Sequence, residues 1–319
     1  MYSTGVMTTL LPLLMALGCS DYQVVESSFV ETFYQPDRGE GIDILWVVDN
    51  SATMYEEHDL LMDSADAFIG FVSNSSVDFR LGVISTDMDD DRGQLNGAVL
   101  DVGSEDMVDT FIEQIEMQIA GSRNEKGFDA ALIGADPDRN PSFARKGADL
   151  ELVVFSDEDD QSSMGVDAFI DTLETQRPNA NVKVHAVVGD PPAGCVSALA
   201  AADVGTRYLE AQSATLGRRE SICTLDYGAM LARVALDVIG LQTSFALSKV
   251  PAVPTIVLTV DGIAPHQRRR DGWWYDPGTN TIEFDGFAVP PPGSQIDVTY
   301  TEWVGPLQDD SDREEEDAE

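Results

Sequence analysis

The sequence predicts an α/β protein built on a doubly wound, mostly parallel sheet, with a small all-β module at the C-terminal end. Two observations lead to this fold class. Between residues 41 and 240, short apolar runs alternate with segments whose apolar residues recur at helical spacing. This alternation is typical of strand-helix-strand crossovers, which place helices on both faces of a parallel sheet. After residue 240 the helical spacing stops, and strand-like runs separated by turn residues follow.

The elements of the α/β part are predicted in chain order from this alternation. Residues 44–48 are apolar throughout, which indicates a strand buried on both faces. Residues 59–73 carry apolar side chains at helical spacing and predict the first helix. The later elements are strands at 80–86, 97–102, 150–155 and 181–188, and helices at 108–119, 127–133, 166–175 and 225–239.

The C-terminal module is predicted as a small β-sandwich-like domain over residues 244–304. Its strand-like runs lie at 255–260, 272–284 and 295–303, and Pro277 to Asn280 interrupt the second run as a hairpin turn would. Its aromatic residues either fill a core or form an exposed platform for a sugar or a partner, and we expect the core. These residues are Trp273, Trp274, Tyr275 and Trp303.

The first apolar strand ends in a pattern of oxygen-bearing side chains. Asp49, Ser51 and Thr53 follow it at alternate positions, so a turn leaving the strand can direct three oxygens at one point. Ligands collect at such strand ends, and hard cations such as Mg²⁺ or Ca²⁺ prefer oxygen ligands. The alternative is purely structural, because a serine or threonine here is also a good helix N-cap.

These residues resemble the metal-ion-dependent adhesion site of von Willebrand factor type A domains, which begins with Asp-x-Ser-x-Ser. Thr53 replaces the last serine and keeps the hydroxyl. The second aspartate of that family corresponds to Asp157, which follows the strand at residues 150–155. The family's threonine between the two motifs has no clear counterpart, and Glu125 or Asn124 stands about where it should. A direct carboxylate ligand there would make the site more negative and less attractive to an acidic partner.

The resemblance covers about residues 41–240 and implies a binding protein, not an enzyme. It implies one divalent cation, Mg²⁺, Ca²⁺ or Mn²⁺, held by Asp49, Ser51, Thr53 and Asp157, with Glu125 as a further candidate. It also implies a protein partner whose acidic side chain completes the coordination of the metal. A second non-enzymatic interpretation is a structural envelope component in which the metal only stabilises the loops.

An enzymatic alternative rests on another resemblance. An aspartate motif after a strand, with a later acidic pair, is similar to haloacid-dehalogenase phosphohydrolases, which need Mg²⁺ and a nucleophilic aspartate. That family has a second aspartate where this chain has Ser51. The acidic surface would also repel phosphate esters, and no glycine-rich phosphate loop is present. These departures from the haloacid-dehalogenase pattern favour the interpretation as a binding protein over the interpretation as an enzyme.

The first nineteen residues predict an export signal. The apolar run of residues 10–17 is too short to span a bilayer, and Gly18 and Cys19 follow it. This segment resembles a bacterial lipoprotein signal, which implies a lipid on Cys19 and a membrane anchor in the cell envelope. Ser20, in place of an aspartate, then suggests the outer membrane. The alternative is an ordinary secretory signal. Polar residues 20–40 are predicted to form a tether.

The chain has three cysteines, and a lipid on Cys19 leaves an even set of two. In an oxidising compartment Cys195 and Cys223 are then expected to form a disulfide. With 3 histidines in the whole chain and two thiols this far apart, the sequence offers no zinc-site spacing.

The net negative charge of the chain argues against two classes of binding partner. The chain has 57 acidic and 19 basic residues, a net charge of -38, so nucleic acid and anionic lipid headgroups would be repelled. An acidic loop at residues 85–93 either holds a second cation or forms the rim of the ligand face, and we expect the rim. The acidic tail at 305–319 is predicted to be disordered.

Overall fold

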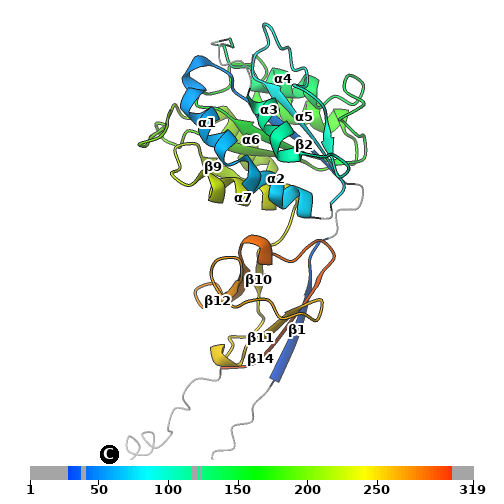
Figure 1. Ribbon diagram of the computed structural model, residues 1–319, viewed down its shortest axis with the longest axis vertical. Helices are drawn as coiled ribbons and strands as arrows, with labels where there is room; N and C mark the ends of the chain where they lie inside the picture. The colour runs from blue at the N-terminus through cyan, green and yellow to red at the C-terminus, as the bar shows by residue number, and fades with distance from the viewer. Residues whose placement is uncertain (1–27, 37–40, 76, 117–120, 123, 304–319) are drawn as a thin grey trace, which may run out of the picture.

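The computed structural model describes residues 28–36, 41–75, 77–116, 121–122 and 124–303. Cys19, the predicted export signal and the acidic tail at 305–319 lie outside the described residues. Within the described part of the chain, no helix is long and apolar enough to cross a bilayer. Figure 1 shows an α/β unit, with the β module at one end of the molecule.

The α/β unit is organised around a six-stranded sheet in the order β4-β3-β2-β5-β6-β9. Neighbouring strands are parallel except for β4, which pairs antiparallel with β3 at one edge. The predicted fold class is therefore confirmed. The strands are β2 (Ile42–Val48), β3 (Phe79–Ser85), β4 (Leu100–Asp101), β5 (Asp149–Phe155), β6 (Val182–Val188) and β9 (Arg219–Ser221).

Helices cover both faces of this sheet because its central strands are apolar on both sides. One core joins the sheet to α1, α2, α3 and α7, and a second joins the opposite face to α4, α5 and α6. In the first core the ring of Trp46 lies 4.9 Å from Phe68 and 5.5 Å from Phe111. The helices are α1 (Tyr55–Asp63), α2 (Ala65–Asn74), α3 (Met107–Ile115), α4 (Gly127–Gly134), α5 (Val166–Gln176), α6 (Thr206–Thr215) and α7 (Tyr227–Val238), with the 3-10 turn η1 (Ala52–Met54) before α1.

The structure differs from the sequence prediction at several elements of this unit. The single helix expected at 59–73 is two helices, α1 and α2, which meet at Ser64. Helix α6 was not predicted, because only Tyr208 and Ala211 of its ten residues are buried and this leaves a weak helical pattern. The two-residue strands β7 (Cys195–Val196) and β8 (Ala201–Ala202) are too short to produce a periodic signal.

The β module consists of two three-stranded antiparallel sheets, in the orders β1-β14-β11 and β10-β13-β12. The predicted turn at residues 277–280 joins β12 to β13, and Asp276 pairs with Thr281 across it. The strands are β1 (Ser28–Tyr34), β10 (Ser244–Ala246), β11 (Val257–Val260), β12 (Trp273–Asp276), β13 (Thr281–Phe284) and β14 (Gln295–Thr301), with short 3-10 turns η2 (Val253–Thr255) and η3 (Gly286–Ala288).

The predicted tether at residues 20–40 is wrong for Ser28–Tyr34, which form β1. This strand pairs with all seven residues of β14, so the module is built from segments on both sides of the α/β unit. The pattern was hard to recognise because Glu31 points inward between Phe29 and Phe33. Its carboxylate accepts a hydrogen bond from the Tyr300 hydroxyl, which makes a polar side chain acceptable at an inward position.

Aromatic side chains form the core of the module. The Phe245 ring lies 5.5 Å from Phe33 and 5.8 Å from Phe284, so it joins the two sheets. Trp273 and Tyr275 are buried, which confirms the expected core role for these two residues. Trp303 is 59% exposed and does not belong to this core.

The two chain connections to the α/β unit lie side by side. The Gln35 side chain donates to the carbonyl of Gln242 at 3.0 Å, and its carbonyl oxygen accepts from the Gln242 amide at 2.8 Å. Phe71 of α2 stacks on Phe287 of the module with ring centroids 4.8 Å apart. Strand β2 starts next to the first connection. The carboxyl end of β2 therefore points away from the β module.

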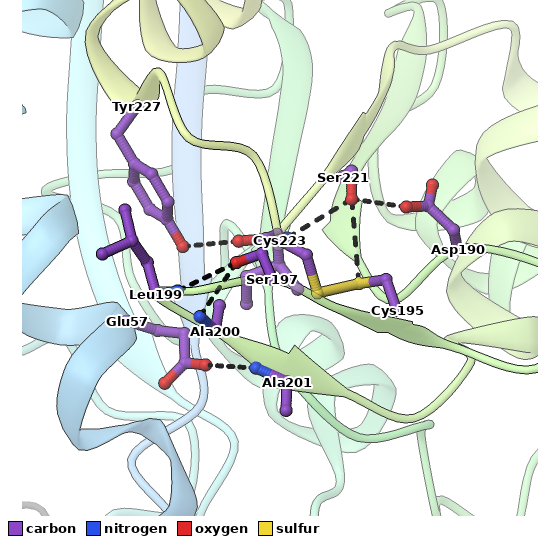
Figure 2. The surroundings of a disulfide bond; sticks show 11 residues. Glu57, Asp190, Cys195, Ser197, Leu199, Ala200, Ala201, Ser221, Cys223 and Tyr227 are labelled. Carbon is purple, nitrogen blue, oxygen red and sulfur yellow. Dashed lines mark hydrogen bonds between the residues drawn. A yellow bond between two sulfur atoms is a disulfide. The ribbon is translucent and has the colours of Figure 1, made fainter.

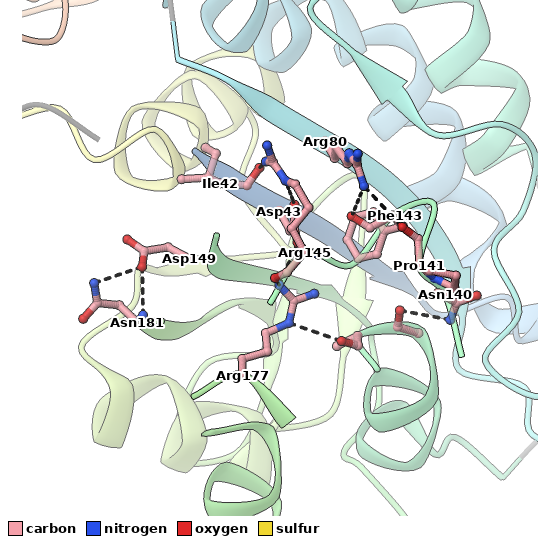
Figure 3. Close-up of polar contacts among 12 residues, drawn as sticks. Ile42, Asp43, Arg80, Asn140, Pro141, Phe143, Arg145, Asp149, Arg177 and Asn181 are labelled. Atoms are coloured by element: carbon pink, nitrogen blue, oxygen red, sulfur yellow. Dashed lines mark hydrogen bonds and ion pairs between the residues drawn. The ribbon is translucent and has the colours of Figure 1, made fainter. Parts of the chain in front are cut away.

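At its first residues, β2 carries a buried ion-pair network (Figure 3). The fully buried carboxylate of Asp43 accepts from Arg177 Nη1 at 2.7 Å and from Arg145 Nε at 2.8 Å. The Arg145 backbone amide also donates to it, at 2.6 Å. These contacts attach the loop before β5 and the end of α5 to the start of β2.

Candidate metal centre at the carboxyl ends of the central strands

Three neighbouring strands direct polar residues to one edge of the central sheet. Asp49 follows β2 and Thr86 follows β3, while Ser156 and Asp157 follow β5. These strands are adjacent and parallel, so their carboxyl ends meet at the same edge. All four residues are buried.

The loop after β2 holds the Asp49 carboxylate in a fixed orientation. The Ser51 backbone amide donates to Asp49 Oδ1 at 2.8 Å, and the Ser156 hydroxyl donates to Oδ2 at 2.6 Å. On the other side, His58 Nε2 donates to the Asp49 carbonyl at 2.7 Å. The histidine therefore positions the backbone of the loop.

The hydroxyls of Ser51 and Thr53 are directed at each other and not at a helix end. Their oxygens are 3.0 Å apart. Ser51 occupies the N-cap position of η1, but no side-chain capping hydrogen bond forms there or at the start of α1. The capping alternative therefore does not account for these two hydroxyls, which remain able to act as oxygen ligands.

Glu125 lies in the same cluster, beside Asp49. Its side chain is fully buried, its Oε2 accepts from the Thr86 hydroxyl, and its Oε1 has no hydrogen-bond partner. Burial, with the nearby charge of Asp49, raises the pKa of Glu125 to about 8, although the hydrogen bond from Thr86 opposes this shift. This carboxyl is therefore harder to ionise than a solvent-exposed glutamate.

Asp157 completes the cluster from the next strand. It is 5% exposed, and its Oδ1 has no hydrogen-bond partner. Burial and the charge of Asp49 raise the pKa of Asp157 to about 7. Like charges that cannot be hydrated destabilise one another, so the cluster favours either bound protons or a bound cation.

The sequence prediction missed two hydroxyl residues of this site, Thr86 and Ser156. Each orients a carboxylate and comes directly after a strand, which is the same signal that identified Asp49. The five predicted residues, Asp49, Ser51, Thr53, Glu125 and Asp157, all lie in this region. Their role as metal ligands remains a prediction.

The donor set fits a hard divalent cation. It consists of carboxylate and hydroxyl oxygens, two of them buried without a partner, and such oxygens are ligands for Mg²⁺, Ca²⁺ and Mn²⁺. Among the residues that the structure describes, no group of three His, Cys, Asp or Glu side chains is arranged to hold an ion by itself.

The acidic loop at 85–93 uses its carboxylates to hold its own backbone. Asp87 accepts from the amides of Asp89 and Asp90 at 2.7 and 3.1 Å and from Ser122 at 3.0 Å. Burial raises the pKa of Asp87, but these amide donors outweigh it and the net pKa is lowered. Asp91 accepts from the Ser85 hydroxyl at 2.6 Å. These bonds favour the rim interpretation over a second cation.

A pocket of about 420 Å³ opens beside the cluster, and a disulfide-linked hairpin forms one of its walls. Cys195 and Cys223 are joined, which confirms the predicted disulfide (Figure 2). The bond ties β7 to the loop before α7, and the Glu57 carboxylate accepts from the Ala201 amide of β8 at 3.4 Å. The pocket is lined by Thr53, Asp157, Glu158, Ala193, Gly194, Cys195, Val196, Ala201, Ala202 and Asp203.

Comparison with solved structures shows which known folds this chain is similar to. The chain is similar to the pilus adhesin SpaC from Lactobacillus rhamnosus GG, with a TM-score of 0.50 and 11% identity over 85% of this chain and 41% of the adhesin. The likeness shows the fold alone. The chain thus spans about two fifths of the adhesin's length. No protein-family model and no curated protein matches the chain.

Two further structures are less similar. One is a von Willebrand factor type A protein from Catenulispora acidiphila, with a TM-score of 0.41 and 10% identity over 88% of this chain and 66% of that protein. The other is proximal thread matrix protein 1 from the mussel byssus, with a zinc-occupied MIDAS motif, a TM-score of 0.43 and 11% identity over 69% of this chain and 52% of that protein. TM-scores under 0.5 support no inference about this chain.

Proposed function

We propose that this chain is an exported cell-envelope protein whose α/β unit, of the von Willebrand factor type A kind, binds a protein partner through a divalent cation. The observation that carries the proposal is the cluster of Asp49, Glu125 and Asp157. These carboxylates are buried at one edge of the sheet, and none forms an ion pair with a basic side chain of the described residues. Two of them have an oxygen without any partner.

The residues of the cluster would have different roles in binding the cation. Ser51 and Thr53 would bind the ion through their hydroxyls, and Asp49 and Asp157 would bind it directly or through water. Glu125 would add its unpartnered oxygen or lie just outside the ligands, held by Thr86. A bound divalent cation supplies positive charge and an open coordination position, which an acidic side chain of the partner would occupy. Likeness to a pilus adhesin is consistent with a surface role.

A phosphohydrolase is not favoured by the site. No basic side chain of the described residues forms an ion pair with Asp49, Glu125 or Asp157, so none is placed there to hold a phosphate. Ser51, where the haloacid-dehalogenase motif has an acid, donates its amide to Asp49 and offers only a hydroxyl to the site. We therefore propose binding without catalysis.

The proposal is tested by calorimetric titration of Mg²⁺, Ca²⁺ and Mn²⁺ into the metal-stripped protein. Saturable binding to the wild type, lost in Asp49→Ala and Asp157→Asn, is expected. Asp167→Asn is the matched control, because Asp167 is an exposed acid in the first turn of α5. Weak binding that is equal in all four proteins would mean that the acidic surface collects cations without a site, and the proposal would fail.

A further inference from the structure

Three adjacent arginines form the only run of basic residues in the described part of the β module. Arg268, Arg269 and Arg270 are all exposed, and we call them the arginine cluster. The one other lysine or arginine of the described module, Lys249, pairs with Glu302 at 3.3 Å. Among the described residues, no carboxylate forms an ion pair with the arginine cluster. Three positive charges therefore lack an ion-pair partner in the described part of a chain that has 57 acidic residues.

The fold holds the arginine cluster in a defined place. The Arg268 amide donates to the Trp273 carbonyl at 2.9 Å, and Arg268 Nε donates to the Asp271 carbonyl at 3.0 Å. The guanidinium carbon of Arg269 lies 5.4 Å from the centroid of the Trp274 ring, which is a cation-π distance. Because these contacts already restrict the loop, binding an anion here costs less conformational entropy than ordering three free arginines would. The arginine cluster therefore suits an anionic ligand.

We propose that the arginine cluster is the docking site of residues 309–319 of the same chain. This acidic segment has eight aspartates and glutamates and a single arginine. A guanidinium group can donate two parallel hydrogen bonds to one carboxylate, so arginine matches a carboxylate ligand in geometry as well as in charge. The inference goes beyond the proposed function and does not depend on the metal.

The connection between the two segments is long enough for this contact. The described chain ends inside the β module, where the Trp303 amide donates to the Val250 carbonyl at 2.9 Å. Residues 304–308 separate this point from the acidic segment and span at most about 17 Å. The segment itself can span a further ~36 Å, whereas a seven-residue strand such as β14 is about 23 Å long. The acidic segment can therefore reach the arginine cluster from Trp303.

Net charge favours a ligand from the same chain over a separate polyanion. The chain has a net charge of -38, which repels an anionic molecule that approaches from solution. Exposed ion pairs are individually weak, so three arginines would gain a free anion little against this repulsion. A linked segment has an effective concentration in the millimolar range and needs no approach from solution. Because the pairs are exposed, the contact should weaken as salt is added.

The exposure of the guanidinium groups in the full chain tests the proposal. Modification by phenylglyoxal, which reacts with arginine, is followed at each site by mass spectrometry with a chelator present. The comparison is a variant in which every acid of residues 309–319 is replaced by its amide. At low salt we expect the arginine cluster to react about threefold or more slowly in the wild type. In about 0.5 M NaCl this difference should disappear. Arg139, an exposed arginine of the α/β unit, should react equally in both proteins.

A reciprocal experiment measures the exposure of the acidic segment. Glutamyl endopeptidase cleaves after Glu314, Glu315 and Glu316, and docking should slow this cleavage at low salt. The cluster variant replaces all three arginines of the arginine cluster with serine, and its segment should be cleaved faster than that of the wild type. The control variant loses three exposed basic residues of the α/β unit: Arg92→Ser, Arg139→Ser and Lys146→Ser. Its segment should be cleaved at the wild-type rate.

Four results would overturn the proposal. The first is an arginine cluster that reacts equally in the wild type and in the amide variant. The second is an equal slowing of Arg139 in the wild type, which would show a general effect of charge. The third is an equal cleavage rate in the cluster variant and the control variant. The fourth is a cluster that is protected only when dextran sulfate is added, which would identify a separate polyanion as its ligand.

Discussion

The two ends of strand β2 each carry a buried aspartate, but they neutralise it differently. Asp43, at the start of the strand, is held by the guanidinium groups of Arg145 and Arg177 at 2.8 and 2.7 Å. Asp49, just past the end, is held by hydroxyl and amide donors and has the acidic side chains of Glu125 and Asp157 as its neighbours. The first aspartate is neutralised by basic side chains of the protein, whereas the second forms no ion pair with a basic side chain of the described residues.

This difference separates a structural ion pair from the candidate metal centre. The Asp43 network joins three segments of chain, and burial lowers the pKa of Arg177 despite the opposing effect of Asp43. The pair remains buried because each charge satisfies the other. The Asp49 end gains no stability from its carboxylates alone, since burial and mutual repulsion raise two of their pKa values. A fold retains such a cluster at a cost that a bound cation can offset.

The largest expected effect is at the neutralised end. Asp43→Ala leaves Arg177 buried without its carboxylate partner, and breaking a buried pair in this way costs about 3–5 kcal/mol. Urea denaturation should show this loss, whereas Asp167→Ala, at an exposed site, should change the free energy of unfolding by roughly 0.5 kcal/mol or less. If the two variants lose equally little stability, the buried ion pairs of Asp43 do not stabilise the fold as we expect.

A smaller stabilisation is expected at the other end when the cation binds. At a Mg²⁺ concentration one hundred times its dissociation constant, the folded state gains about 2.7 kcal/mol if the unfolded chain does not bind the ion. Thermal unfolding should therefore shift upward with Mg²⁺ in the wild type and in Asp167→Asn, but not in Asp49→Ala. A shift of the same size in Asp49→Ala would place the ion elsewhere on the acidic surface.

The smallest effect expected is a pH dependence of the metal-free protein. The pKa of Glu125 is raised from 4.5 to about 8 in the folded state, so its contribution to stability is present below pH 4.5 and is lost as pH rises through 8. Glu125→Gln should flatten this decline, because glutamine cannot ionise. Melting temperatures at pH 6 and pH 8.5, measured with a chelator present, test this. Parallel declines in both proteins would assign the pH dependence to other groups.

The candidate site was predictable because its signal is local. A buried strand followed by oxygen-bearing side chains identified Asp49, Ser51 and Thr53, and the same rule identified Asp157. The rule applied equally to Thr86 and Ser156, but hydroxyls after strands are common and only their contacts with Glu125 and Asp49 distinguish them. Glu125 came from its place in the resemblance, and folding brings it to the cluster.

The contacts that could not be predicted join residues far apart in the chain. Asp43 and Arg177 are separated by 134 positions, and no local pattern indicates that they meet. Strand β1 pairs with β14 across nearly the whole described chain. Its alternation of apolar and polar residues was hard to recognise because Glu31 occupies an inward position. Helix α6 buries few apolar residues, so its helical spacing was weak.

The sequence by itself determined the α/β class, the strand ends and the residue types that form the candidate metal centre. These depend on burial and periodicity, which are properties of short segments. Only the tertiary structure decided which charges are neutralised. Asp43 and Asp49 belong to the same short stretch of sequence, yet one meets two arginines and the other meets two acids. Electrostatic energy depends on distances in space, and folding sets those distances.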